Sequence, residues 1–242
     1  MADEVYRQKE KKIINIKFTG MKPRFTYKDV FVFLTALTPL IYLAIVYDGL
    51  NNTVPVHFNL EGKADSFGNK STLWLAVITL AVSAILVYLL LKFIPLIDPK
   101  KKAVQSSAVY QKIAFATAIL LTGIGFLIIQ SAKTGSFYSS NFMFAGLGLL
   151  FAFIGNLMYS IKPNYFAGIR TPWTLEDEDT WRKTHQLASR IWVAGGIALS
   201  IFAIVLPIKI LIIVFYSIMG VMVLIPVIYS YTYYKKHHKQ NT

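Results

Sequence analysis

Six long runs of uncharged, mostly apolar residues alternate with polar stretches along this chain. They cover residues 30–47, 71–91, 113–132, 142–161, 191–208 and 210–234. Each run approaches the roughly 20 residues that an α-helix needs to cross a hydrocarbon core about 30 Å thick. The pattern predicts an all-α integral membrane protein with six transmembrane helices, in which the even number of spans places both termini on the same side.

The polar stretches divide the predicted bundle into three parts. These are a basic tail at 1–28, two spans with an outer loop at 29–97, and a four-span module at 98–242. The module contains the longest polar interruption, the loop at 162–190, which holds nine charged side chains. The segments before and after this loop are expected to hold it at a membrane face.

The loop at 162–190 is expected to change from extended chain to helix near its middle. Pro172 disfavours helical backbone at Thr171, and Thr174 is a candidate N-cap whose hydroxyl would accept from the amide of Asp177. A helix is therefore predicted from Leu175 to at least residue 190. Four acidic residues at 176–179 fall in its first turn, where the helix dipole favours negative charge.

Two further patterns describe the helix predicted from Leu175. Carboxylates and cations four residues apart predict the pairs Asp179 to Lys183 and Glu178 to Arg182. One face carries an apolar stripe, formed by Trp181, Thr184, Ala188 and Ile191. This stripe predicts an amphipathic helix that lies in the membrane interface and leads into the fifth span.

The composition supports the membrane class and explains the net charge. The chain is 55% hydrophobic and 15% charged, with a mean hydropathy of +0.51 and a formal charge of +13. Of its 25 Lys and Arg residues, 21 lie in the two tails and in the loops at 92–112 and 162–190. The positive-inside rule then predicts cytoplasmic termini, and membrane topology explains the basicity without direct nucleic-acid binding.

The outer loop after the first span is the second informative polar stretch. Val54, Val56 and Phe58 alternate with polar residues, which predicts a short extended segment followed by a turn at 59–62. His57, Asn59 and Asp65 could meet around this turn. Such a group could be a hydrogen-bonded cluster, a divalent-cation site or a contact for a ligand or toxin.

The spans themselves carry little chemistry. The six runs contain no ionisable side chain, whereas proton-coupled carriers and intramembrane hydrolases need one. The chain has no cysteine and no metalloprotease, serine-hydrolase or Walker motif. We therefore expect no enzymatic activity, cofactor or resident metal.

Pro39 should kink the first span, with Thr35 or Thr38 bonding a freed carbonyl, and glycines in the third and fourth spans favour close helix packing.

Two stretches together resemble a known family. In the outer loop, Pro55, His57, Asn59, Gly62, Asp65 and Lys70 are similar to a small membrane domain of unknown function that often precedes the Sdp immunity module. The later loop, with Asn164, the string from Gly168 to Leu175 (GIRTPWTL), Trp181, Lys183 and His185, resembles that module itself. The chain therefore resembles the SdpI family of bacteriocin immunity proteins over roughly residues 30–234.

The resemblance implies a multi-pass protein of the bacterial cell membrane that protects against a secreted, membrane-depolarising peptide by binding or excluding it in the bilayer. It also implies a second activity, because the best-studied member captures a transcriptional repressor at the membrane. The candidate residues for contact with the toxin or partner are Asn164, Arg170, Thr171, Pro172, Trp173, Thr174, Leu175, Trp181, Lys183 and His185.

Other roles for these residues and for the chain stay open at this point. Arg170 could pair with the acidic residues at 176–179 or with lipid phosphate, and the tryptophans could be interfacial anchors. The protein as a whole could instead act in signalling, by sequestering a small DNA-binding repressor. It could also be a small-molecule transporter with its site at the cytoplasmic mouth of the bundle.

Overall fold

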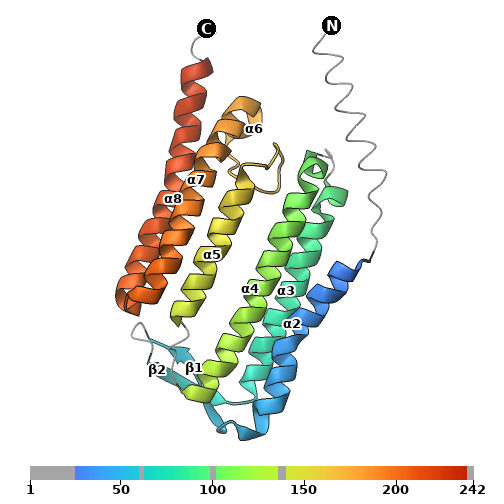
Figure 1. Ribbon diagram of the computed structural model, residues 1–242, viewed down its shortest axis with the longest axis vertical. Helices are drawn as coiled ribbons and strands as arrows, with labels where there is room; N and C mark the ends of the chain where they lie inside the picture. Colours follow the sequence, from blue (N-terminus) through green and yellow to red (C-terminus); the bar gives the residue numbers. More distant parts are fainter. Residues whose placement is uncertain (1–24, 60–62, 99–101, 136–139, 239–242) are drawn as a thin grey trace.

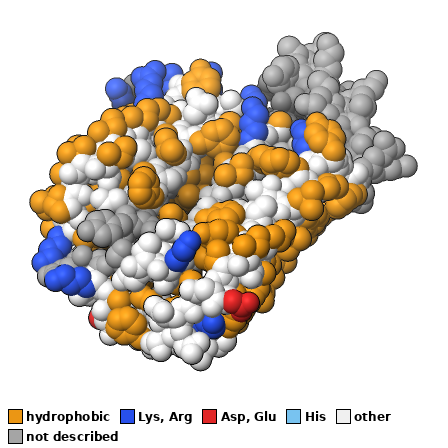
Figure 2. Space-filling model, turned by 60° about the horizontal axis from the view of Figure 1, so that its bottom comes forward, with side chains coloured by type: hydrophobic (Ala, Val, Ile, Leu, Met, Phe, Trp, Pro, Cys, Tyr) orange, Lys and Arg blue, Asp and Glu red, His pale blue; other side chains and the backbone are white. Residues whose placement is uncertain are grey.

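The computed structural model describes residues 25–59, 63–98, 102–135 and 140–238 as a bundle of long helices with a small hairpin at one end (Figure 1). Six helices are long and apolar enough to cross a membrane: α2 (Tyr27–Val46), α3 (Thr72–Ile97), α4 (Ser107–Thr134), α5 (Ser140–Met158), α7 (Glu178–Val205) and α8 (Ile208–His238). The prediction of an all-α protein with six transmembrane helices is confirmed. Figure 2 shows that hydrophobic side chains cover much of its surface, as expected for contact with lipid.

Five short elements complete the described chain. The hairpin consists of β1 (Thr53–Phe58) and β2 (Ala64–Asn69), and a short helix, α6 (Pro172–Glu176), precedes α7. Two 3₁₀ turns, η1 (Tyr47–Gly49) and η2 (Lys102–Ser106), follow α2 and precede α4. The hairpin lies at one end of the bundle and α6 at the other (Figure 1).

The six long helices form two groups of three. Helices α2, α3 and α4 pack against one another, and α7 packs against both α5 and α8. Along the bundle, the two groups meet where α4 contacts α5, and Figure 1 shows them side by side. We call these groups the first and second units.

Small residues allow the backbones of α5 and α7 to come into direct contact. A Cβ atom built on Gly148 would lie 2.6 Å from the carbonyl oxygen of Gly196, and one on Gly196 would lie 2.4 Å from the amide nitrogen of Ala152. The Ser200 hydroxyl adds a hydrogen bond to the Ala145 carbonyl at 3.0 Å. The prediction that glycines permit close helix packing is confirmed, because any side chain here would separate the two helices.

Proline in α2 is accommodated as the sequence predicted. Pro39 removes the hydrogen bond that the carbonyl of Thr35 would otherwise accept, and the Thr38 hydroxyl donates to this carbonyl at 2.7 Å. A Cβ atom on Gly125 of α4 would lie 3.1 Å from the Cβ atom of Pro39. The freed carbonyl is therefore satisfied within α2, and the proline ring packs on a glycine of the neighbouring span.

The extended segment predicted at residues 54–58 is confirmed as β1, which pairs with a second strand, β2, that was not predicted. Pro55 pairs with Phe67 and His57 with Ser66, so the ladder bulges between Pro55 and His57. The alternation predicted from Val54, Val56 and Phe58 is therefore wrong: Val54 and Pro55 are buried, whereas Val56 is exposed. The bulge inserts one residue and changes which side chains face the bundle.

The N-cap predicted at Thr174 is also wrong. The chain forms two helices here, and the carboxylate of Asp177 caps α7 by accepting from the amide of Thr180 at 2.7 Å. Thr171 is extended, as predicted, but it is itself the N-cap of α6. Pro172 explains the difference, because proline is favoured at the first helical position and makes the preceding residue the cap.

The amphipathic segment is part of the fifth span rather than a separate interfacial helix. Helix α7 continues without a break from Glu178 to Val205. The predicted stripe faces protein, because Trp181, Thr184 and Ala188 are all buried. The stripe is therefore a packing face, and the predicted continuation of this helix into the fifth span is confirmed.

The ion pairs at the start of α7 differ from those predicted. Instead of the pairs Asp179 to Lys183 and Glu178 to Arg182, the guanidinium of Arg182 pairs with the carboxylate of Asp179, three residues before it. The same carboxylate accepts a hydrogen bond of 2.5 Å from the hydroxyl of Tyr233 in α8. This contact draws Asp179 toward α8, and because Arg182 is exposed the ion pair contributes little to stability.

A buried ion pair joins α2 to α3 and was not predicted. The side chain of Asp29 is fully buried and lies 2.5 Å from the ammonium of Lys92, which is 15% exposed. The carboxylate also accepts from the hydroxyl of Tyr88 at 2.9 Å and from the amide and hydroxyl of Thr26. The charge of Asp29 is therefore balanced, and its oxygens are bonded inside the first unit.

We expect the substitution Lys92→Met to lower the free energy of unfolding by roughly 3–5 kcal/mol, because it leaves a carboxylate buried without its cation. Asp29→Asn should cost less, since the long stem of Lys92 can carry its ammonium toward water. Combining Asp29→Asn with Lys92→Met should restore part of the loss. Chemical unfolding of the purified protein in detergent measures all three variants.

Lys133→Met is the matched control for this experiment, because Lys133 is an exposed lysine of α4. It should change the free energy of unfolding by less than about 0.5 kcal/mol. Equal losses for Lys92→Met and Lys133→Met would show that the buried pair does not stabilise the fold.

Candidate functional site

The segment between α5 and α7, residues 161–177, folds over one end of the bundle, and we call it the capping loop. Asn164 organises it and is only 1% exposed. Its Oδ1 accepts at 2.8 Å from the Tyr110 hydroxyl and from the amides of Phe166 and Ala167, while its Nδ2 donates to the carbonyls of Lys162 and Ala167. One side-chain amide thus replaces the hydrogen bonds that a helix or sheet would supply.

A buried histidine fixes the middle of the capping loop. Nε2 of His185 accepts from the amide of Ile169 at 3.1 Å, and Nδ1 lies 2.8 Å from the carbonyl of Trp181. A carbonyl only accepts, so the proton lies on Nδ1 and the ring is neutral. Gly168 passes over this ring with φ at +105°, and a Cβ atom there would lie 2.3 Å from Nε2.

Trp181 lies beneath this contact and is not an interfacial anchor. Its ring is 1% exposed and stacks on the imidazole of His185 with 4.1 Å between the ring centroids. The indole nitrogen donates to the carbonyl of Ile161 at 2.8 Å. The interpretation of Trp181 as a membrane-surface residue is therefore wrong, and the ring belongs to the core of the second unit.

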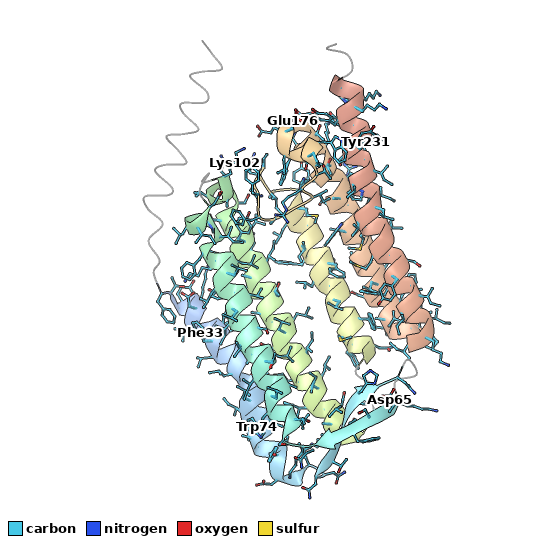
Figure 3. All side chains as sticks on the ribbon, turned by 180° about the vertical axis from the view of Figure 1, so that it is seen from behind. Phe33, Asp65, Trp74, Lys102, Glu176 and Tyr231 are labelled. Atoms are coloured by element: carbon cyan, nitrogen blue, oxygen red, sulfur yellow. The ribbon has the colours of Figure 1, made fainter. Side chains whose placement is uncertain are left out.

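Thr171 and Trp173 both contribute to the packing of helix α6 on α8. The Thr171 hydroxyl, which accepts from the amide of Thr174, also lies 3.1 Å from the Ser230 hydroxyl. The ring of Trp173 packs edge to face on Tyr231 with 5.3 Å between centroids. Figure 3 shows Tyr231 and Glu176 together at this end of the bundle. Thr171, Trp173 and Thr174 of the GIRTPWTL string therefore hold the capping loop in place.

The residues that this string leaves at the surface are few. Arg170 and Pro172 of the string are exposed and Leu175 is half-buried, and Lys183, farther along in α7, is also half-buried. The guanidinium of Arg170 donates to the carbonyl of Tyr165, and among the described residues it forms no ion pair with a carboxylate. The predicted pairing of Arg170 with the acidic residues at 176–179 is thus not formed.

The capping loop also connects the two units. Its amide at Lys162 donates to the hydroxyl of Ser106 at 3.0 Å, and the Tyr110 hydroxyl reaches Asn164 from α4. Phe166 packs against a buried cluster of the first unit that contains Ile94 and Tyr110. The loop therefore bridges the two units at this end.

At the opposite end, the hairpin brings two of the three predicted polar residues together. Nδ1 of His57 lies 2.5 Å from Oδ1 of Asp65, on side chains that are 68% and 41% exposed. Asn59 instead bonds across the turn to the backbone of Lys63, and Gly62 lies outside the described residues. Within the described ranges, no three His, Cys, Asp or Glu side chains are placed to hold a metal ion.

The remaining two residues singled out in the outer loop have structural contacts. The ammonium of Lys70 donates to the carbonyls of Tyr47 and Leu50 and lies 4.7 Å from the centre of the Tyr47 ring. Pro55 is buried beside Val54, which packs into the cluster that joins α2, α3 and α4. Both residues hold the hairpin on the first unit.

An apolar cleft of about 580 Å³ lies beside the hairpin, between helices of the two units. Its walls come from β1, from the start of α3, from α4 and α5, and from the start of α8. Representative lining residues are Phe58, Ala76, Ile128, Phe144 and Ile212. We call it the outer cleft, and its volume is typical of sites that bind small or extended apolar ligands.

Two sequence families match parts of the chain. Residues 160–230 match the SdpI/YfhL protein family, and residues 34–81 match a domain of unknown function, DUF1648. The first range contains the capping loop, α6 and α7, whereas the second contains the hairpin. α5 lies outside both ranges.

One curated protein, the immunity protein SdpI of Bacillus subtilis (strain 168), is 33% identical to this chain over 91 residues. The match covers 38% of this chain and 44% of the relative, which is less than half of that protein's length. No solved structure matches the chain.

We expect Asn164→Ala to lower the free energy of unfolding by roughly 2–5 kcal/mol, because the buried Tyr110 hydroxyl and two half-buried amides lose their acceptor. Tyr110→Phe removes a single bond and should cost about 1 kcal/mol. Unfolding in detergent and protease cleavage within residues 162–177 measure the effect. Arg170→Ala, at an exposed position, is the control; a loss as large as that of Asn164→Ala would contradict the role of Asn164.

Gly168→Ala should destabilise the protein by roughly 2–4 kcal/mol, through both backbone strain and a clash with His185. Gly135→Ala is the matched control, since Gly135 also has a positive φ, of 70°, but has open space around its Cα atom. It should lose only the strain contribution, about 1 kcal/mol. Equal losses in thermal unfolding would show that His185 does not restrict this position.

Proposed function

Since residues 160–230 make this chain a member of the SdpI/YfhL family, we propose that it is an immunity protein that protects a bacterial cell from a membrane-active peptide toxin. The observation that carries this proposal is the 33% identity to the immunity protein SdpI. A multi-pass protein with six apolar helices is compatible with a target that acts in the bilayer.

We place the toxin contact at the outer cleft. The distribution of Lys and Arg supports an orientation with the capping loop and both termini in the cytoplasm, so that the hairpin faces the side from which a secreted peptide arrives. Because the cleft lies between two helix units and has apolar walls, it can accept an apolar peptide segment.

We propose that protection at this site is non-covalent, because the walls of the outer cleft consist mostly of apolar side chains. Immunity would therefore follow from sequestering the peptide, which keeps it from forming a conducting state.

Signalling is a second candidate function, which the exposed side of the capping loop favours. Arg170, Pro172, Glu176, Glu178 and Arg182 are all exposed at this end. A rigid loop that presents charges of both signs suits a soluble partner, such as a small DNA-binding repressor. This activity would use the opposite end of the molecule from the outer cleft.

The test is the survival and membrane potential of a sensitive bacterium that expresses the protein and is exposed to the Sdp peptide. We expect the wild type to preserve the membrane potential. Ala76→Phe fills the outer cleft and should lower survival at least about tenfold, because the peptide loses part of its apolar contact with the cleft. Ala44→Phe is the matched control, because Ala44 is exposed on α2 and does not line the cleft.

Each variant must reach the membrane in the wild-type amount, and Ile212→Trp fills the same cleft from α8 in case Ala76→Phe fails to fold. Full protection by both cleft variants would show that the toxin does not bind in the outer cleft. An unprotected wild type would overturn immunity against this peptide. Loss of repressor co-sedimentation in Arg170→Ala, with protection retained, would assign signalling to the capping loop.

A further inference from the structure

A second cavity, of about 710 Å³, opens on the side of the bundle and is separate from the outer cleft. It lies between α2 and α4, with Tyr88 of α3 and Phe153 of α5 at its edges. Phe31 and Phe115 form one wall, stacked with 5.4 Å between ring centroids. We call it the lateral cavity.

The lateral cavity has an apolar interior and a positively charged rim. Lys28 at the start of α2 and Lys112 in the second turn of α4 both line it, together with the amide of Gln111. No carboxylate is among its lining residues in the described part of the chain, and neither lysine forms an ion pair there. Two cations therefore face one cavity without a matching anion from these residues.

The neighbouring acidic residue does not cancel this charge. Asp29 follows Lys28 directly, but its carboxylate is fully buried and is paired with Lys92 at 2.5 Å. The Tyr88 hydroxyl, whose ring borders the cavity, donates to the same carboxylate. Asp29 is thus neutralised inside the first unit, and the rim of the cavity keeps the charge of its two lysines.

The surroundings of the cavity are those of a protein surface that faces lipid. Phe31 is 53% exposed and Ile119 is 50% exposed, on helices apolar enough to cross a membrane. Lysines near the ends of such helices extend toward phospholipid headgroups while their stems follow the apolar surface. The lateral cavity therefore combines a site for an acyl chain with two cations at its rim.

We propose that the lateral cavity binds one anionic phospholipid, with its phosphate between Lys28 and Lys112 and an acyl chain between α2 and α4. A phosphate accepts charge-assisted hydrogen bonds from both ammonium groups. Phe31 and Phe115 supply the apolar wall for the chain. This site is independent of the proposed immunity function, because it uses neither the outer cleft nor the capping loop.

Native mass spectrometry of the purified full-length protein in detergent tests this site. The probes are dioleoylphosphatidylglycerol, dioleoylphosphatidylcholine and inorganic phosphate, so that headgroup charge, acyl chains and free phosphate are compared separately. We expect the wild type to prefer the anionic lipid, and the double variant Lys28→Gln with Lys112→Gln to lose this preference by roughly 30-fold.

Lys162→Gln combined with Lys236→Gln is the matched control, since it removes two exposed lysines that do not line the cavity. This pair should retain the preference. Ala116→Phe fills the cavity with the charges intact and should reduce the binding of both lipids. The Ala116→Phe result therefore distinguishes lipid binding in the cavity from general attraction of lipid to a basic surface.

Three results would overturn the proposal. An unchanged lipid preference in the Lys28 and Lys112 variant would show that these lysines do not bind the headgroup. An equal loss in the control pair would indicate nonspecific attraction to a basic surface. Displacement of the lipid by inorganic phosphate at equal concentration would assign a simple anion site. Thermal unfolding of each variant confirms that the folded protein is compared.

Discussion

Close contact between the backbones of α5 and α7 is the constraint on which the second unit depends. At Gly148 and Gly196 the two helices are separated by less than the width of a methyl group. Lipid chains are as apolar as the side chains of a span, so helices associate here through close packing and hydrogen bonds rather than through the exclusion of water. This contact fixes the direction of α7. The N-terminal part of the same helix carries Trp181 and His185, which lie under the capping loop.

The capping loop shows how irregular chain can be stable at the end of a membrane bundle. Its backbone lacks the ladder of a helix or sheet, and the missing partners come from two buried side chains, Asn164 and His185. Each uses both its donor and its acceptor, so neither leaves a polar atom unsatisfied. The loop is consequently a fixed part of the scaffold, and Arg170 and Pro172 are among the side chains that it leaves exposed.

The apolar runs were sufficient to predict the six spans, because the length of a run measures the thickness of the membrane directly. Proline and glycine chemistry was predicted correctly where it is local, as at Pro39 and Thr38. The hydrogen bond between Tyr110 and Asn164 and the pair between Asp29 and Lys92 could not be predicted, because each joins helices whose relative rotation no local pattern reveals. Thr174 was misassigned as a cap for a different reason: two competing caps, Thr171 and Asp177, flank it, and only the folded loop decides between them.

The division into two units of three spans has a consequence for biosynthesis. Three is an odd number, so the chain leaves the first unit on the opposite side of the bilayer from the one on which it entered, and the second unit is inserted in the inverted orientation. Tyr110 is translated 54 residues before its acceptor Asn164. Until the capping loop emerges from the ribosome, the Tyr110 hydroxyl on α4 therefore lacks the acceptor that it has in the folded protein.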